Sequence, residues 1–251
     1  MTAAAHNHPL VRKLESIFAL SEDEKSAIAA LPMRVAALGA DQDIAREGDS
    51  PSHCCLILGG YAAVTKLLLT GQRQITAFQI AGDMPDLLSL HLETMDSGIS
   101  TLTPCQVAFI EHKAIRDLCR QFPRITDALW RATLIEASIF KEWIANVGQR
   151  TAYPRLAHLL CETLVRSEAV GLAEDHTCEF PVTQRELGEA TGMTEVHVNR
   201  TLKALKDAGL ISLNAKKLQA TDWAGLKGAG QFDAGYLHLA ASKIDQRGIV
   251  Q

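Results

Sequence analysis

The spacing of apolar residues changes twice along the chain, and each change marks a change in the predicted structure. Up to Pro32 and again after Glu111, apolar residues recur every three or four positions, as in amphipathic helices. Between Val35 and Ile110 they form short stretches broken by Gly, Asp and Pro, which predicts an antiparallel β-barrel or jelly roll. We therefore expect an α+β fold with four parts: a helical lead-in over 1–33, a barrel over 34–122, a long helix over 123–148 and a C-terminal domain over 149–251.

The long predicted helix carries two apolar stripes, and a helix that is apolar on more than one side must bury both. One stripe lies near heptad spacing and comprises Leu129, Ala132, Ile139 and Trp143. The other comprises Ile125, Trp130, Leu134, Phe140 and Ile144. We expect one face to pack on the chain's own barrel and assign the heptad stripe to a second copy of the chain. A helix packed only on its own barrel remains the alternative. A hinge is predicted over 148–151.

Two short helices joined by a tight turn are predicted between Thr183 and Ala208. Thr183 and Glu186 have the spacing of a capping box, which satisfies two backbone N–H groups at a helix start. Gly192 permits the turn, and Thr194 caps the second helix. This is the layout of a helix-turn-helix, whose second helix enters the major groove of DNA.

The surroundings of this motif are predicted to be less regular. An irregular loop is expected over 167–181, and strands over 210–213 and 218–220 are expected to form a hairpin after the second helix. The tail beyond Leu239 is expected to be loosely held.

Charge distinguishes this motif from an ordinary pair of packed helices. Between Val198 and Lys217 the sequence has five basic residues and one acidic residue, Asp207, a local net charge of +4. The whole chain carries a formal net charge of −4, so the positive charge is concentrated here. A surface that faces phosphates needs such a concentration. The sequence therefore predicts double-stranded DNA as a partner.

With these features, the chain resembles the CRP/FNR family of bacterial transcription regulators. The most specific segment is MTEVHVNRTLKALKDAGLISL, and the Gly-Asp turn at Gly82-Asp83 adds weaker support. The resemblance implies a cyclic-nucleotide-binding-type sensor barrel, a dimerisation helix and a winged helix-turn-helix that binds an inverted repeat as a homodimer. RNA polymerase would be a further partner of an activator. The resemblance also places Arg200 at the arginine that reads a guanine.

The side chains expected to contact DNA fall into two groups. Arg200, Val196, Glu195 and Asn199 are candidates for base contacts, since an arginine fork can span two guanine acceptors and a valine can pack on a thymine methyl. Candidates for phosphate contacts, which position the protein without specifying sequence, are Thr183, Gln184, Arg185, Thr194, Lys203 and Lys217. Family members with well-understood sites usually have a glutamate at the position of Val196, so the operator sequence is left open.

The resemblance places an effector cassette at Asp86, Met95, Asp96 and Ser97. The family's phosphate-binding arginine falls at Met95, and no lysine or arginine occurs between Gly82 and Asp96. An anionic phosphate would lose its bidentate partner and meet acidic residues instead. We therefore expect that cyclic AMP is not the effector, whose identity the sequence leaves unknown.

Other chemistries remain as alternatives. A haem- or iron–sulfur-dependent gas or redox sensor of the same fold would use histidines or the six cysteines, yet no cysteine lies within residues 1–53. A cupin-like barrel enzyme would need a set of metal-binding histidines in a pattern that is absent, so no enzymatic activity is expected. No apolar run reaches the ~18 residues of a membrane span, and six unpaired cysteines suit a reducing cytoplasm.

Overall fold

The structure, a computed structural model, describes residues 6–240, so nearly all of the tail beyond Leu239 lies outside the described residues. The chain divides into two compact units, residues 1–136 and 137–251, called here the N-terminal and C-terminal units. The division falls inside the long helix. Among the described helices, none has the length and apolar character needed to span a bilayer.

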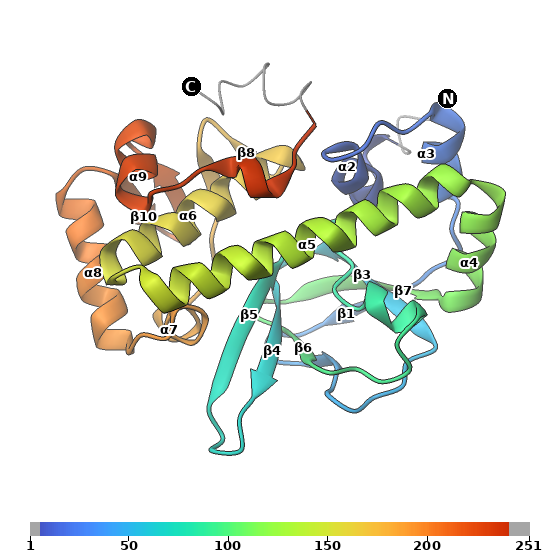
Figure 1. The fold of residues 1–251 in the computed structure, drawn as a ribbon, viewed down its shortest axis with the longest axis horizontal. Helices are drawn as coiled ribbons and strands as arrows, with labels where there is room; N and C mark the ends of the chain where they lie inside the picture. The colour runs from blue at the N-terminus through green and yellow to red at the C-terminus, as the bar shows by residue number, and fades with distance from the viewer. Residues whose placement is uncertain (1–5, 241–251) are drawn as a thin grey trace. The chain divides into compact units, whose positions relative to one another are not determined.

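The N-terminal unit is built on two antiparallel sheets, as the alternation of short apolar stretches predicts (Figure 1). One sheet has the strand order β1-β7-β3 and the other the order β2-β6-β4-β5. The strands are β1 (Arg34–Leu38), β2 (Asp43–Ala45), β3 (His53–Gly59), β4 (Ala62–Leu67), β5 (Arg73–Gln79), β6 (Gly98–Thr101) and β7 (Cys105–Glu111).

Strand β3 lies at the centre of this unit's core. Its residues Cys54 to Ile57 are all buried, so the strand is covered on both of its faces rather than on alternate residues. A strand of this kind reads as a continuous apolar run, and the sequence of β3 has that form. The loop that follows β5 is bonded to this strand, since Ile57 N donates to Asp83 O at 3.0 Å and Gly82 N donates to Ile57 O at 2.8 Å.

Short helices accompany the sheets. Before them come α2 (Pro9–Glu15) and α3 (Glu22–Ala29), and η1 (Leu87–Leu90) lies between β5 and β6. Helix α3 begins with a capping box formed by Ser21 and Glu24. After the sheets come α4 (His112–Gln121) and α5 (Pro123–Gln149), the longest helix (Figure 1).

The C-terminal unit packs short helices and a small sheet around α6 (Ala152–Ala169), most of which is buried. The two helices of the predicted motif are α7 (Gln184–Thr191) and α8 (Glu195–Asp207). Helix α9 (Trp223–Gly230) and the turn η2 (Ala234–Leu237) complete it. The sheet has the order β10-β11-β9-β8, with β8 (Ala173–Glu174), β9 (Thr177–Glu179), β10 (Ile211–Asn214) and β11 (Lys217–Ala220).

Strands β8 and β9 correct the prediction of an irregular loop over 167–181. They form a hairpin whose two-residue turn is Asp175-His176, and both residues are left-handed, with φ of 47° and 52°. Tight hairpin turns need such φ values and usually show Gly or Asn in the sequence. Because glycine is absent from this turn, the hairpin could not be predicted from its turn residues. It joins the predicted wing through β9 and β11.

Candidate nucleic-acid interface

The local structure of α7 and of the turn after it follows from four side chains. Thr183 Oγ1 accepts a hydrogen bond from Glu186 N at 3.2 Å, and Thr183 N donates to Glu186 Oε2 at 2.6 Å, which completes the predicted capping box. Gly192 ends α7 in the left-handed conformation, with φ of 68°. At Gly188 a Cβ atom would lie 2.5 Å from Met193 O, so only glycine lets the turn fold back this closely.

Helix α8 separates an apolar face from a polar one. Val198, Leu202 and Leu205 are buried, with exposed fractions of 0%, 4% and 0%. The opposite face is exposed and carries the four predicted base-contact residues, Glu195, Val196, Asn199 and Arg200. Val196 is the extreme case, with 81% of its surface exposed. An apolar side chain so fully in solvent is suited to a partner that offers a methyl group or a base edge.

Arg200 is exposed on α8, and the sequence left open an ion pair with Glu195 or Asp207. Among residues 6–240 the structure contains neither pair, although such pairs do form nearby, as between Arg185 Nε and Glu189 Oε1 at 3.1 Å. A guanidinium that no carboxylate engages retains all of its donors for an external acceptor. The structure therefore presents Arg200 as a residue available to a ligand.

A groove of about 480 Å³ runs between α7, α8 and the β10–β11 hairpin. Three lysines line it: Lys203 and Lys206 from α8 and Lys216 from the turn of the hairpin. Lys206 Nζ donates to Leu213 O at 3.2 Å, so α8 and the hairpin are joined across the groove. Lys206 and Lys216 belong to the local positive charge that the sequence predicts, and Lys216 lies in the turn of the predicted hairpin.

Lys217 lies differently from its neighbour. It lines a separate depression together with Glu168, Glu174, Asp175 and Glu179, where acidic side chains predominate. In the sheet, Lys217 of β11 lies directly opposite Glu179 of β9. Lys216 lies in the turn of the hairpin, in the left-handed conformation with φ of 64°, whereas Lys217 is the first residue of β11, and the two lysines line different surfaces. Of the two lysines, Lys216 is thus the one that the groove presents to a polyanion.

The remaining predicted contacts are partly engaged within the protein. Asn199 Nδ2 donates to Gln184 Oε1 at 3.0 Å, which links the two helices of the motif. The Thr183 hydroxyl donates to Glu186 Oε2 at 2.8 Å, and Thr194 Oγ1 accepts from His197 N at 3.3 Å as the cap of α8. These groups hold the motif together at its exposed surface, and Arg200 and the lysines project from it.

The predicted effector cassette differs from the DNA-facing surface in burial. Asp86 is 3% exposed, and its two carboxylate oxygens accept from Cys55 N at 2.8 and 2.9 Å. Burial raises the pKa of Asp86 to about 6. Met95, 1% exposed, is tied through its backbone to Gly48 and Asp49. Ser97 is buried as well, and only Asp96 of the four is exposed.

A cation does approach this cassette, but from another strand. Lys66 of β4 donates through Nζ to the carbonyl oxygen of Asp96 and pairs with Glu47 Oε1 at 2.8 Å. Sequence distance hid this contact, since Lys66 precedes the cassette by thirty residues. Because the ammonium already has an acidic partner, it does not replace the arginine that grips a phosphate in the resembled cassette.

The cysteines are mostly internal. Five of the six are buried, and Cys119 is intermediate. Burial raises the pKa of Cys54 to about 12 and also raises that of Cys55 well above its ordinary value. Metal ligation requires the thiolate, which this environment disfavours. Within residues 6–240, no group of three or more His, Cys, Asp or Glu side chains is placed to hold a metal ion.

The stripe that we assigned to the second copy is already covered within one chain. Leu129, Ile139 and Trp143 are 8%, 7% and 7% exposed, and Ala132 is intermediate. The exposed apolar residues of α5 are instead Trp130, Leu134 and Ile144, at 66%, 57% and 72%. Heptad spacing identified a real stripe, but spacing alone cannot tell which of two stripes the rest of the chain covers.

A capped helix-turn-helix with an exposed basic face and a hairpin wing defines the C-terminal unit as a winged-helix DNA-binding domain, joined to a jelly-roll barrel. Comparison with known proteins agrees for both units. Residues 154–229 match the Crp-like helix-turn-helix domain, and residues 36–122 match the cyclic nucleotide-binding domain. The chain belongs to the CRP/FNR family of transcription regulators.

Individual relatives are of moderate similarity. The transcriptional activator protein FnrL of Cereibacter sphaeroides is 26% identical over 74% of this chain and 76% of its own length. The nitrogen fixation regulation protein FixK of Azorhizobium caulinodans is 25% identical over 86% of this chain and 87% of its own. The solved structure of FixK2 from Bradyrhizobium japonicum has a TM-score of 0.73 at 22% identity and covers 81% of this chain and 100% of its own.

Proposed function

We propose that α8 reads DNA bases and that Arg200 is its principal reader. The observation that carries this proposal is an exposed guanidinium on a capped helix that no described carboxylate engages. An arginine in this state can donate two hydrogen bonds to O6 and N7 of a guanine. Val196 and Glu195, one turn earlier, would then meet the neighbouring base pairs, and Lys203, Lys206 and Lys216 would meet phosphates along the groove.

The proposed active form is a homodimer joined through the exposed stripe of α5. Trp130, Leu134 and Ile144, together with Ala137 between them, lie at intervals of four, three and seven residues, which are the intervals between the two apolar positions of a heptad. That spacing is the seam of a two-stranded coiled coil. A two-fold dimer presents two copies of α8, so the proposed operator is an inverted repeat whose half-sites lie about 34 Å apart.

For the barrel we propose an effector other than a cyclic nucleotide. Asp86 is buried and bonded to the backbone of Cys55, and Lys66, which donates to the carbonyl oxygen of Asp96, is paired with Glu47. Neither group is arranged to receive a ribose phosphate. The relative named FnrL is described as an activator. If this chain is also an activator, RNA polymerase is its further partner, and the chain acts in the cytoplasm.

One set of measurements tests the function. Fragments of the source genome are selected for binding to the full chain, and the selected duplex is footprinted. The expected result is protection of two half-sites one helical turn apart, by a species that sedimentation identifies as a dimer. Failure to select any duplex at low salt would contradict the proposal. Calorimetry with cyclic AMP on the same sample is expected to show no binding, and tight binding would overturn the proposal for the barrel.

A further inference from the structure

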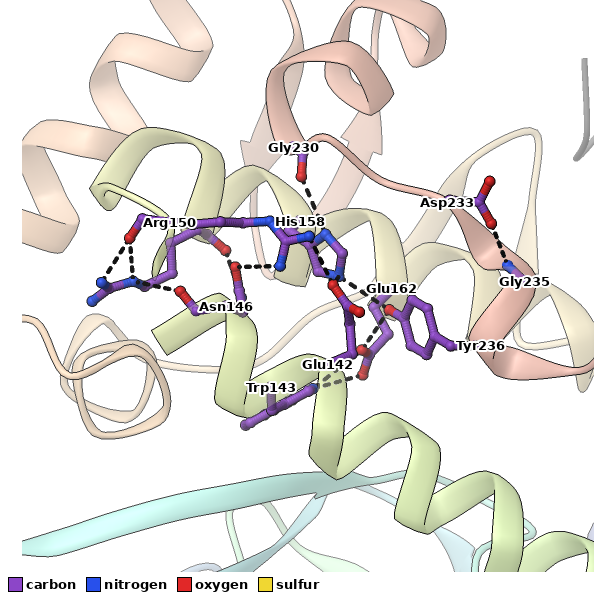
Figure 2. Close-up of polar contacts among 11 residues, drawn as sticks. Glu142, Trp143, Asn146, Arg150, His158, Glu162, Gly230, Asp233, Gly235 and Tyr236 are labelled. Carbon is purple, nitrogen blue, oxygen red and sulfur yellow. Dashed lines mark hydrogen bonds and ion pairs between the residues drawn. The ribbon is translucent and has the colours of Figure 1, made fainter. Parts of the chain in front are cut away.

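The C-terminal turns of α5 are clasped onto α6 by a cluster of buried side chains (Figure 2). Trp143 Nε1 donates to both carboxylate oxygens of Glu162 at 3.1 Å. Glu142 Oε1 pairs with Arg150 Nη2 at 2.7 Å, and Tyr236 donates to Glu162 Oε2 at 2.8 Å. Glu162 is 1% exposed, and removing one partner of a buried charge is costly. The end of α5 is therefore a fixed part of the C-terminal unit.

One guanidinium continues this connection toward the helix-turn-helix. Arg155 Nε donates to Asn146 O at 3.1 Å, and Nη2 donates to Arg150 O at 2.7 Å, which places Arg155 on the last turn of α5 and the residue after it. On its other side, Nη1 donates to Thr191 O at 2.7 Å, the final residue of α7. Asn146 Nδ2 returns a bond to Arg155 O at 3.1 Å. A single side chain thus binds the carboxyl ends of two helices.

The chemistry of these contacts favours a rigid link. The last carbonyl groups of a helix lack partners within the helix and carry partial negative charge. A planar guanidinium supplies several charged donors in a fixed fork, so it can bind carbonyls from different elements at once. A lysine has one nitrogen on a flexible stem and cannot span both sites in the same way. The spacing between the ends of α5 and α7 is therefore set by the shape of this side chain.

The position of Thr191 determines the position of α8. Only Gly192 and Met193 separate it from Thr194, the cap of α8. Met193 N donates to Gly188 O at 3.1 Å, which holds the turn tightly against α7. A Cβ atom at Gly192 would lie 3.7 Å from Val147 Cγ1, so the turn also packs on the end of α5. A displacement of the Thr191 carbonyl would therefore displace the start of α8, which is only three residues further along the chain.

We propose that Arg155 is a positioning residue for DNA recognition, which ties the end of α5 to the turn before α8 and so fixes the angle at which α8 meets the major groove. This inference rests on the proposed base contacts of α8, but it adds a residue outside the DNA-facing surface. In this proposal the guanidinium of Arg155 is used by backbone carbonyls of Asn146, Arg150 and Thr191 and contacts neither bases nor phosphates. Its removal is therefore expected to reduce the preference for the operator while leaving the electrostatic attraction to any duplex intact.

The test compares Arg155→Gln with Arg120→Gln in the full chain. Arg120 is exposed on α4 and pairs at 2.6 Å with Asp117, whose side chain is partly exposed, so the control removes the same charge without leaving a buried carboxylate unpaired. Affinities are measured for the genome-selected operator and for an unrelated duplex at several salt concentrations. For Arg155→Gln we expect a ten- to hundredfold loss of operator affinity, a change of less than about twofold on the unrelated duplex, and an unaltered salt slope.

Hydrogen exchange supplies a second readout. In Arg155→Gln the backbone amides of residues 147–151 and 192–197 are expected to exchange faster together, because one side chain orders both segments. Arg155→Lys retains the charge but has only one side-chain nitrogen. We expect this variant to be folded and to lack the operator preference of the wild-type chain, as Arg155→Gln does.

Four other outcomes would contradict the proposal. Unchanged operator affinity in a folded Arg155→Gln protein would show that the link does not position α8. A salt slope reduced by about 0.9 per subunit would instead make Arg155 a phosphate contact. Unfolding of both Arg155→Gln and Arg155→Lys would show that Arg155 is required for the fold itself. If the wild-type chain selected no duplex at all, the proposed base contacts would fail first, which is a distinguishable result.

Discussion

The DNA-facing surface and the effector cassette were both identified from residue types at family positions, yet they have opposite physical states. Arg200 and Val196 are exposed, and no described carboxylate engages the arginine. Asp86 and Met95 are 3% and 1% exposed and are bonded within the barrel. A buried carboxylate that already accepts from the backbone has less capacity left for a ligand than an exposed guanidinium that no carboxylate engages. Exposure combined with unused hydrogen-bonding capacity is therefore what separates the two regions.

The same distinction applies to the two stripes of α5. The stripe with Leu129 and Trp143 is covered within the chain, whereas the stripe with Leu134 and Ile144 is in solvent. A helix stripe of large apolar residues is costly to leave in water and marks an interaction site. Substitutions at exposed positions should therefore impair binding without unfolding, and substitutions at buried positions should change stability. The following predictions use that contrast.

The largest expected effect is that of Arg200→Ala on operator binding. Each bidentate arginine–guanine pair contributes about 1–3 kcal/mol of discrimination, and a dimer makes the pair twice. The midpoint for two pairs is about 4 kcal/mol, so we expect operator affinity to fall by about a thousandfold while the fold and thermal stability are unchanged. Fluorescence anisotropy and circular dichroism measure the two properties. Arg200→Lys keeps the charge without the fork and should recover non-specific binding only. An undiminished footprint with Arg200→Ala would remove this residue from the interface.

The next effect concerns assembly. Leu134→Glu places a carboxylate in the proposed seam, where its burial against a second copy is unfavourable. We expect the dimer dissociation constant to rise by about a hundredfold or more, with the monomer still folded because the residue is 57% exposed in a single chain. Sedimentation equilibrium measures this change. Leu92→Glu is the matched control, since Leu92 is similarly exposed at 56% but lies outside α5. A Leu134→Glu protein that remained dimeric would place the seam elsewhere.

The buried carboxylate of the cassette gives a smaller effect, on stability. The pKa of Asp86 is raised from 3.8 to about 6 by burial, so the folded chain holds this proton more tightly than the unfolded chain. The stabilisation is fully present below pH 3.8 and is lost as the pH rises through about 6. Asp86→Asn removes the charge and keeps one acceptor for Cys55 N. We expect it to stabilise the protein at pH 8 by on the order of 3 kcal/mol relative to its effect at pH 4.

Urea unfolding of the variant and wild type between pH 4 and 8 measures this difference. Asp96→Asn is the matched control for the loss of one negative charge, because Asp96 is an exposed member of the same cassette. If Asp86→Asn gave a difference that did not vary with pH, the carboxylate of Asp86 would not be held in the state that its burial indicates. A protein destabilised at pH 8 would show that the ionised group is required by its neighbours.

Much of this architecture could be predicted from local sequence. The capping box at Thr183, the left-handed end of α7 at Gly192 and the length of α5 depend on neighbouring residues, and each is present. What could not be predicted depends on distant contacts. Trp143 belongs to an apolar stripe, but its indole N–H is bonded to Glu162, nineteen residues away, and this contact buries it within the chain. Arg155 carries no local signal of its links to Asn146 and Thr191.

The smallest expected effect concerns phosphate contacts along the groove. Lys203 lines the groove and is exposed on α8, and neutralising one phosphate changes the slope of log Kd against log salt by about 0.9. For Lys203→Gln we expect the slope to fall by about that amount per subunit, with an equal loss on operator and unrelated duplexes. Lys227→Gln is the matched control, because Lys227 lies on α9, 5.9 Å from the centre of the Trp223 ring. A loss of affinity for the operator alone would show that Lys203 contacts bases. The base-contacting part of α8 would then extend about one turn beyond Arg200, to Lys203.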